Sequence, residues 1–405
     1  MSQILLITIS GADHPGVTAG ITAILARHNV NILDIGQAVI HATLSMGVLA
    51  ELPDGSLRQQ VADEVERCGR DQGLHVRIAD VAEESYGQWV EAQGRARYIV
   101  TLLARKITAD QIARVTEVVS RHGLNIDGIN RLSGRIPLGD LPALSRACVE
   151  FSVRGPLTDS SAFRRDLLEV AGALEVDLAF QQDNMYRRNR RLVAFDMDST
   201  LIEAEVIDEL AARAGVGKQV AAITERAMRG EIDFSASFRE RVALLKGLDE
   251  HVLAEIADEL KITEGAEHLI STLRTLGYRT AILSGGFTYF ARYLQKRLGM
   301  DYVHANELDI EDGKVTGRVS GAIVDGERKA QLLRQLAEAE GIDLQQVIAV
   351  GDGANDLPML STAGLGIAFH AKPLVQQSAE QSISTLGLDA ILYLLGFSDR
   401  YQERF

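Results

Sequence analysis

The sequence predicts an α/β protein in which two small βαββαβ domains precede a larger domain with a doubly wound parallel sheet and an inserted helical cap. Three observations predict this class. A segment at residue 27 recurs at residue 121, apolar strands alternate with helices after residue 191, and a long helical stretch follows the first of these strands. With 405 residues, 46% of them apolar, the chain is long enough for two or three buried cores.

The two small domains are expected over residues 1–84 and 95–180, because RHNVNI from Arg27 returns as RHGLNI from Arg121. Each copy predicts a strand, a helix, two strands, a helix and a strand, which is the ferredoxin-like order. The strands of the first copy are predicted at Ile4–Ser10, near Asn31–Ile40 and Met46–Leu52, and at Val76–Val81. The second copy follows from Tyr98 to Phe180.

In the first copy, the turn Gly11-Ala12-Asp13-His14-Pro15-Gly16 joins the first strand to the first helix. Its glycines allow a ligand to approach the backbone closely, and a helix N-terminus can hold a carboxylate. A plain turn without a ligand also fits these residues. The two copies resemble ACT domains. This resemblance implies an amino-acid effector, L-serine or another amino acid, at Gly11, Asp13 and Gly16. In the second copy, Arg105-Lys106-Ile107-Thr108 occupies the equivalent turn without glycines, so a second such pocket is in doubt.

Bulk properties restrict the class of partner and the compartment. The net charge of -14 argues against nucleic-acid binding, and no stretch approaches the ~18 consecutive apolar residues of a membrane span. Cys68 and Cys148 lack metal-ligand spacing and are expected to be reduced thiols of a cytoplasmic protein. The polar residues 181–190 form the predicted linker, and the arginines that end this stretch favour a solvated connector.

The large domain is expected over residues 191–405. Its apolar strands are predicted at Leu192–Phe195, Arg279–Leu283, Val347–Val350 and Leu365–Ala368. The helical stretch at about 203–261 is too long for one crossover helix and predicts a cap. Asp312-Gly313 between two extended runs predicts a hairpin turn.

Polar residues follow several of these apolar runs. Asp196 and Asp198 close the first strand, where residues two apart on an extended chain point to the same side. Ser284-Gly285-Gly286 closes the second strand, Lys329 follows the hairpin, and GDGAND begins at Gly351. Because the carboxyl ends of parallel strands meet at one edge, we predict a magnesium-dependent phosphoryl-transfer site there.

This order of motifs resembles the haloacid dehalogenase superfamily over about residues 191–395. The resemblance implies that Asp196 is a nucleophile forming an aspartyl-phosphate, and that Asp198 is the general acid and base. It also implies that Asp196, Asp352 and the backbone carbonyl of Asp198 bind Mg²⁺, a hard cation that takes oxygen ligands.

Other residues are implied by the same resemblance to act around the phosphate. Ser284 and Gly285 would hold phosphoryl oxygens, and Lys329 would add a positive charge to the transition state. Asn355 and Asp356 would orient ligands, Asp356 from behind the metal.

Parts of the cap resemble the phosphoserine phosphatase family more closely, in the form with two ACT domains. Glu205 matches a position near the substrate ammonium, and Arg241 one that grips its carboxylate with two parallel hydrogen bonds. Met228 and Phe234 match positions that close over the carbon skeleton, with buried helix packing as the alternative.

The resemblance implies hydrolysis of O-phospho-L-serine to L-serine and phosphate, the last step of serine biosynthesis, with feedback by an amino acid. Two alternatives stay open: transfer of the phosphoryl group from Asp196 to another alcohol, and binding of phosphorylated ligands without turnover. Paired ACT domains expose strand edges or helix faces, which predicts a homodimer.

Overall fold

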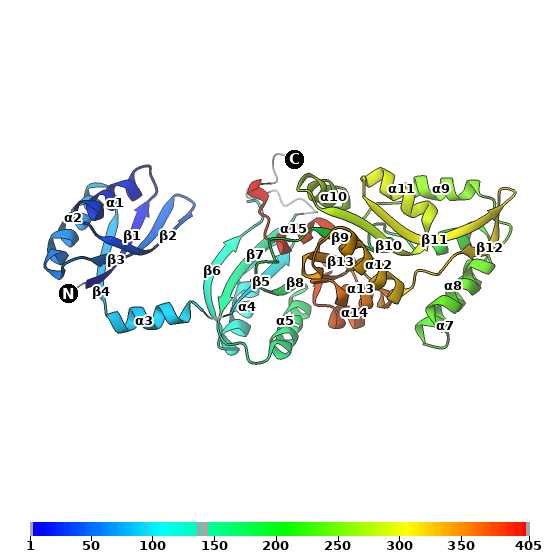
Figure 1. The fold of residues 1–405 in the computed structure, drawn as a ribbon, viewed down its shortest axis with the longest axis horizontal. Coiled ribbons are helices and arrows are strands. Elements are labelled where there is room, and N and C mark those ends of the chain that lie inside the picture. Colours follow the sequence, from blue (N-terminus) through cyan, green and yellow to red (C-terminus); the bar gives the residue numbers. More distant parts are fainter. Residues whose placement is uncertain (1–2, 95, 136–138, 140–144, 402–405) are drawn as a thin grey trace. The chain divides into compact units, whose positions relative to one another are not determined.

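The computed structural model describes residues 3–94, 96–135, 139 and 145–401, and divides into two compact units, residues 1–95 and 96–405 (Figure 1). The predicted domain limits at residues 1, 95 and 405 lie outside the described residues. Within the described residues, the helices are too short or too polar to cross a membrane.

The first unit has the predicted βαββαβ order, in a sheet with strand order β2-β3-β1-β4. Its elements are β1 (Gln3–Ala12), α1 (Val17–Arg27), β2 (Asn31–Ile40), β3 (Thr43–Leu52), α2 (Arg58–Asp71) and β4 (His75–Val81). Alternate residues of β1 and β3 are buried against α1 and α2 in one apolar core, as the period of two predicts. A further helix, α3 (Glu83–Ala92), follows β4 and was not predicted.

The second unit begins with the other copy of the repeat, in a sheet with strand order β6-β7-β5-β8. Its elements are β5 (Arg97–Ala104), α4 (Ala109–Arg121), β6 (Asn125–Arg131), β7 (Ala147–Arg154), α5 (Ser160–Leu174) and β8 (Asp177–Gln182). Thr108 and Gln111 form a capping box at the start of α4, which explains why the helix begins there. The predicted ferredoxin-like repeat is confirmed.

The large domain contains a sheet with the order β12-β11-β10-β9-β13-β14-β15, parallel except for β12. The predicted strands are confirmed as β9 (Leu192–Phe195), β10 (Arg279–Phe287), β13 (Val347–Gly351) and β14 (Leu365–Phe369). The others are β11 (Tyr302–Glu311), β12 (Lys314–Ser320) and β15 (Gln381–Ile383), and the helices flanking the sheet are α10 (Ala266–Thr275), α11 (Thr288–Leu298), α12 (Gly326–Ala339), α13 (Leu357–Thr362), α14 (Pro373–Ser378) and α15 (Ile391–Leu394).

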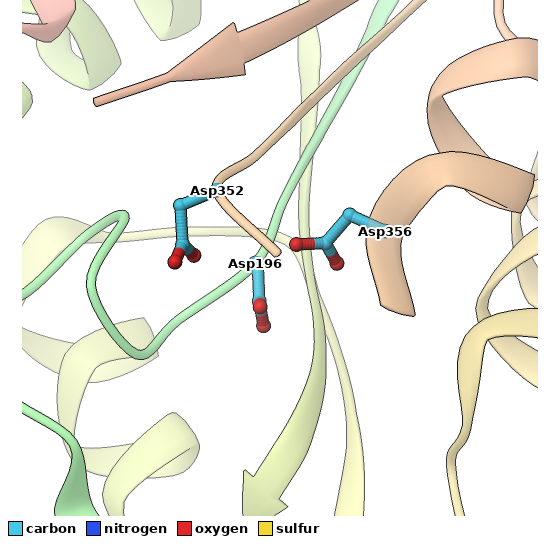
Figure 2. A group of neighbouring side chains, drawn as sticks. All are labelled: Asp196, Asp352 and Asp356. Atoms are coloured by element: carbon cyan, nitrogen blue, oxygen red, sulfur yellow. The ribbon is translucent and has the colours of Figure 1, made fainter. Parts of the chain in front are cut away.

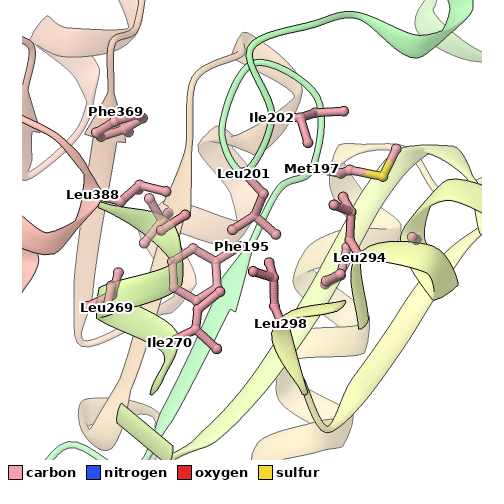
Figure 3. Close-up of a cluster of buried hydrophobic side chains, with 14 of the residues drawn as sticks. Phe195, Met197, Leu201, Ile202, Leu269, Ile270, Leu294, Leu298, Phe369 and Leu388 are labelled. Atoms are coloured by element: carbon pink, nitrogen blue, oxygen red, sulfur yellow. The ribbon is translucent and has the colours of Figure 1, made fainter. Parts of the chain in front are cut away.

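Strand β9 lies at the centre of this sheet and is buried on both faces. Val193 and Phe195 pack into one apolar core, and Leu192 and Ala194 pack into another on the opposite face. Figure 3 shows Phe195 surrounded by side chains of the first of these cores. Since both faces are apolar, the polar residues that follow β9 emerge only at the carboxyl edge of the sheet.

The predicted helical cap is confirmed as α6 (Val206–Arg213), α7 (Gly217–Met228), α8 (Phe234–Ala243) and α9 (His251–Glu259). The hairpin of β11 and β12 supports it, because Val315 N donates to Leu248 O at 2.9 Å and Gly247 N donates to Val315 O at 2.8 Å. The predicted hairpin turn has positive φ at both Asp312 and Gly313, as a tight hairpin turn requires.

The expectation of a solvated connector at residues 181–190 is wrong for two of its arginines. Arg187 is 1% exposed and forms an ion pair with buried Glu150, and Arg190 is 6% exposed. The physical reason is that the segment joins the second βαββαβ domain to the large domain, and these two domains pack together in one compact unit. The carboxylate of Asp177 at the start of β8, for example, accepts hydrogen bonds from the backbone N–H groups of Ser384 and Thr385.

Candidate active site

Asp196 is the first residue after β9 and is held between two parallel strands. Its backbone N–H donates to the carbonyl of Val350 in β13 at 2.9 Å, and Met197 N donates to Asp196 Oδ1 at 2.7 Å. Because β9 and β13 are neighbours in register, the residues that follow them come together at one edge. The sequence argument from strand ends is therefore confirmed for Asp196 and Asp352.

Three carboxylates gather at this edge. Asp196, Asp352 and Asp356 each offer an oxygen within 4.8 Å of the others, and Figure 2 shows them around one point. Thr200 Oγ1 donates to Asp352 Oδ1 at 3.2 Å, while Gly353 N donates to Asp356 Oδ2 at 3.0 Å. Asp356 therefore belongs to the acidic cluster, and its place behind the metal stays a prediction.

Lys329 extends from α12 into this cluster and is fully buried. Its Nζ lies 2.9 Å from Asp196 Oδ1 and 2.7 Å from Asp356 Oδ1. Burial lowers the pKa of Lys329, but attraction to Asp196 and Asp356 outweighs it and leaves the pKa raised. Lys329 therefore stays positively charged.

One ammonium group does not balance three carboxylates. Burial, followed by repulsion from Asp356, raises the pKa of Asp196 to about 8 and that of Asp352 to about 7. A divalent cation with oxygen ligands would relieve this repulsion, so the donor set fits a hard metal such as Mg²⁺.

Asp198 lies beside this cluster and is fixed from two sides. Its Oδ1 accepts a hydrogen bond from Val206 N at 3.2 Å, and a Cβ added at Gly286 would lie 2.5 Å from its Oδ2. Glycine at 286 is therefore required by this close approach. Burial, followed by the charges of Glu205 and Asp196, raises the pKa of Asp198 well above its usual value, which suits a carboxyl group that donates a proton.

Ser284, Gly285 and Gly286 lie inside the last part of β10, where the register to β11 shifts, rather than after the strand as predicted. Buried Ser284 accepts a hydrogen bond at its Oγ from Gly286 N at 2.9 Å. Asn306 Nδ2 donates to the carbonyl of Gly285 at 2.8 Å and holds this loop in place.

Sequence reasoning missed Asn306 and Thr200. Asn306 lies within β11, where nothing in the local pattern marks it. Thr200 belongs to the Asp-x-Asp-x-Thr pattern that Asp196 begins, and this pattern was the available signal. The predicted Asn355 lies at the same edge, with its Oδ1 against the backbone of Gly353.

Two predicted cap residues contact the large domain, Phe234 at the sheet and Met228 at the start of α14. Phe234 at the start of α8 reaches Gly285, where an added Cβ would lie 2.9 Å from the ring, and it stacks on Phe238 at 6.0 Å between centroids. Met228 is 67% exposed at the end of α7, with Lys372 Nζ 3.7 Å from its sulfur. The alternative that Met228 fills a helix core is therefore wrong.

The two predicted clamp residues face the same acidic region. Glu205 precedes α6 and accepts a hydrogen bond from Ser199 Oγ at 2.7 Å, and burial raises its pKa. Arg241 in α8 is half-buried. Burial lowers the pKa of its guanidinium, and the charges of Asp208 and Glu205 raise it by less.

The predicted effector residues lie in the other compact unit, but the turn is shorter than predicted, because Gly11 still belongs to β1 and pairs with Leu44 of β3. Gly16 precedes α1 with φ of +101°, a conformation that residues with side chains rarely adopt. Exposed Asp13 lies in the turn between β1 and α1, and its backbone N–H donates to Ala42 O at 2.9 Å.

Comparison with known families divides the chain into three matches. Residues 190–364 match the haloacid dehalogenase-like hydrolases, and residues 3–79 and 96–181 each match the ACT domain.

Two relatives are similar over nearly the whole chain. The phosphoserine phosphatase of Streptomyces coelicolor is 42% identical over 398 residues, which cover 97% of this chain and 92% of the relative. Phosphoserine phosphatase SerB2 of Mycobacterium tuberculosis is 42% identical over 397 residues, covering 97% and 93%. The unliganded structure of a probable phosphoserine phosphatase from Vibrio cholerae has a TM-score of 0.60 and 35% identity, covering 78% of this chain and 90% of that chain.

We expect Mg²⁺ to raise the melting temperature of the metal-free protein at pH 8, because it would relieve repulsion among buried carboxylates. A ligand at a concentration of one hundred times its Kd stabilises the folded state by about 2.7 kcal/mol. Asp352→Asn should raise the melting temperature without metal and remove most of the Mg²⁺ effect, since Asp352 has a pKa of about 7 and is mainly ionised at pH 8.

Thermal denaturation with and without Mg²⁺ measures both effects. Asp110→Asn, at an exposed position on α4, is the matched control and should change neither. An undiminished Mg²⁺ effect in Asp352→Asn would contradict a metal site at this cluster.

Proposed function

This chain belongs to the phosphoserine phosphatases of the haloacid dehalogenase-like hydrolases, and we propose that it hydrolyses O-phospho-L-serine to L-serine and phosphate. One observation carries the proposal: buried Lys329 contacts Asp196 at the carboxyl edge of the sheet, with Asp198 and Asp352 beside them. The choice of ester is supported by the similarity to two phosphoserine phosphatases over 97% of the chain.

In the proposed first step, Asp196 attacks the phosphorus atom. Met197 N and Lys329 Nζ both hold Oδ1, so Oδ2 is the oxygen proposed to form the new bond. The bond between phosphorus and the serine oxygen breaks as the aspartyl-phosphate forms, which divides one difficult displacement into two easier ones.

Asp198 moves the proton in both steps. It donates a proton to the departing serine oxygen, consistent with its raised pKa, and then takes one from the water that attacks the aspartyl-phosphate. That second attack releases phosphate and restores Asp196. The contacts of Asp198 with Val206 N and Gly286 would keep its carboxyl group in place for both transfers.

The remaining residues hold charge around the phosphate. Asp196, Asp352 and the backbone carbonyl of Asp198 would hold Mg²⁺, whose charge lets an anionic carboxylate meet an anionic phosphate. Ser284, Gly285 and Lys329 would bind phosphoryl oxygens. Asp356 would orient Lys329, to which it is hydrogen-bonded at 2.7 Å, and Asn355 would lie beside the substrate.

The cap supplies the proposed contacts to the amino acid. Glu205 would bind the substrate ammonium and Arg241 its carboxylate, and each influences the pKa of the other across the same region. Phe234 and Met228 would cover the short carbon skeleton from α8 and α7. The contact of Phe234 with Gly285 supports this placement, because it lies over the proposed phosphate loop.

We expect Asp196→Asn to reduce phosphoserine hydrolysis to background, because the nucleophile is lost. Asp198→Asn should lower kcat by roughly 10²- to 10⁴-fold, the usual range for a general acid and base. Phosphate release with and without Mg²⁺ measures both. Asp312→Asn in the distant hairpin turn is the control and should retain activity, and substantial hydrolysis by Asp196→Asn would rule out the mechanism.

Arg241→Ala should raise KM for phosphoserine by roughly 10- to 100-fold, the range for a lost hydrogen bond between charged groups. Hydrolysis of a simple aryl phosphate, which has no carboxylate to bind, should change much less. Arg239→Ala removes an exposed arginine from the same helix and should leave both substrates unaffected. Equal losses with both esters would contradict a role for Arg241 in substrate choice.

We further propose that the first ACT domain, within residues 1–84, binds an amino acid such as L-serine at Gly11, Asp13 and Gly16. The start of α1 supports this, because Gly16 provides no side-chain cap and leaves the first backbone N–H groups of the helix for an anion. Regulation then requires that the effector bind two states of the protein with different affinity.

L-Serine should inhibit the protein noncompetitively, and Gly16→Val should weaken the inhibition because valine disfavours a φ of +101°. Activity measured against serine concentration checks this. Gly47→Ala, at a glycine in β3 with free space around it, is the control. Unchanged inhibition in both Gly16→Val and a chain lacking residues 1–95 would place the effector elsewhere.

We also propose a cytoplasmic homodimer. Cys68 and Cys148 are both free thiols, which supports the compartment. Strand β2 supports the dimer, because this edge strand of ten residues exposes apolar side chains of 40–77% relative accessibility: Ile32, Ile35, Val39 and Ile40. An edge of this kind is suited to pairing with a second copy.

The mass in solution, measured by light scattering, should be that of a dimer. Ile40→Lys should shift it toward the monomer, because a charge at the exposed edge opposes strand pairing. Leu276→Lys, at an exposed apolar residue of the large domain, should leave the dimer intact. A monomeric native protein would overturn the proposal.

A further inference from the structure

The cap leaves and rejoins the large domain through two short segments, residues 201–203 and 261–263, that pair with each other. Two backbone hydrogen bonds join them, from Glu203 N to Lys261 O at 2.9 Å and from Thr263 N to Leu201 O at 3.0 Å. Ile202 in this pair also forms a bridge with Asp198. The base of the cap is therefore connected directly to the loop that carries Asp198.

The second ACT domain contacts this base through Arg105. Both Nη atoms of Arg105 donate to Glu264, the residue after the paired segment, at 2.8 Å each. This bidentate geometry fixes direction as well as distance. Ser145 Oγ donates to the Arg105 carbonyl at 2.9 Å, which holds the backbone from which the guanidinium extends.

A second ion pair strengthens the same junction. Arg146 pairs with Asp389, and Asp389 lies directly against the backbone of Gly265. The carbonyl of Glu264 also accepts a hydrogen bond from Leu388 N at 2.8 Å. The segment that ends the cap insertion is thus held by two arginines of the second ACT domain, one directly and one through Asp389.

The position of Arg105 in the repeat is informative. It lies between β5 and α4, in the turn equivalent to the one in the first copy that contains Gly16. One copy of the turn therefore has a glycine backbone suited to a ligand, whereas the other has a cation that reaches the base of the cap.

We propose that Arg105 is a positioning residue for the phosphatase, acting through Glu264 to hold the base of the cap in the arrangement that binds substrate. This inference rests on the proposed function. Hinge segments set how often a cap adopts its closed state. Substrate affinity decreases when a smaller fraction of the protein is in that state. The ion pair should therefore affect KM more than kcat.

The full-length protein with Mg²⁺ tests this through Arg105→Ala, Glu264→Ala, the double variant, and the charge exchange of Arg105→Glu with Glu264→Arg. Each alanine variant should raise KM for phosphoserine about five-fold with kcat within about two-fold, as expected for losing a partly exposed ion pair. The double variant should be no worse than either single one, and the charge exchange should restore much of the KM.

Hydrogen exchange of the Glu203 and Thr263 amides gives a second readout that needs no turnover. Both amides should exchange several-fold faster in the alanine variants, because the paired segments would separate more often. Arg58→Ala is the matched control, since Arg58 is as exposed as Arg105 and makes a bidentate pair with Asp80 in the other unit. It should change neither KM nor exchange at these amides.

Unchanged KM, or no rescue by charge exchange, would overturn the positioning role, as would unchanged amide exchange. If the native protein hydrolysed no phosphoserine, the proposed function would fail. Exchange would still show whether Arg105 holds the base of the cap, so the two failures are distinguishable.

Discussion

Lys329 places a full positive charge inside the large domain, between Asp196 and Asp356. Ions at such depth are tolerated only when they are paired and hydrogen-bonded, because desolvation is costly. The pairing lets the central strand β9 end in a carboxylate at a buried position. It also leaves the cluster with excess negative charge, which fits the proposed binding of a cation.

The same balance of charge explains why two carboxyl groups only two residues apart can act differently. Asp196 also has a raised pKa, but it lies against Lys329 and the backbone N–H of Met197, and both contacts favour its ionised form. Asp198 lies between Val206 and Gly286, nearer Glu205, where burial and like charge favour a proton. Different environments thus support the proposed roles of Asp196 as nucleophile and Asp198 as proton donor.

The two ACT domains are related by sequence but differ in their relation to the large domain. The first forms its own compact unit, while the second shares one with the large domain. Leu103 and Cys148 of the second ACT domain share one apolar core with Phe195 of the large domain, which makes this second junction a continuous interior. The two copies of the repeat have therefore diverged, since only the second is part of the compact unit that contains the large domain.

Much of this arrangement could be predicted locally. Alternating apolar residues indicate β1 and β3, a continuous apolar run indicates β9, and strand order then brings Asp196 and Asp352 to one edge. The roles of Glu205 and Arg241 required family resemblance, because single charges on helices are ordinarily exposed. Burial of Arg187, support of Gly285 by Asn306, and the pair of Arg105 with Glu264 were not predictable, since each joins segments distant along the chain. Sequence periodicity indicates which face of an element is apolar. The burial of a charged group and the direction of its pKa shift depend on neighbours that only tertiary packing brings together.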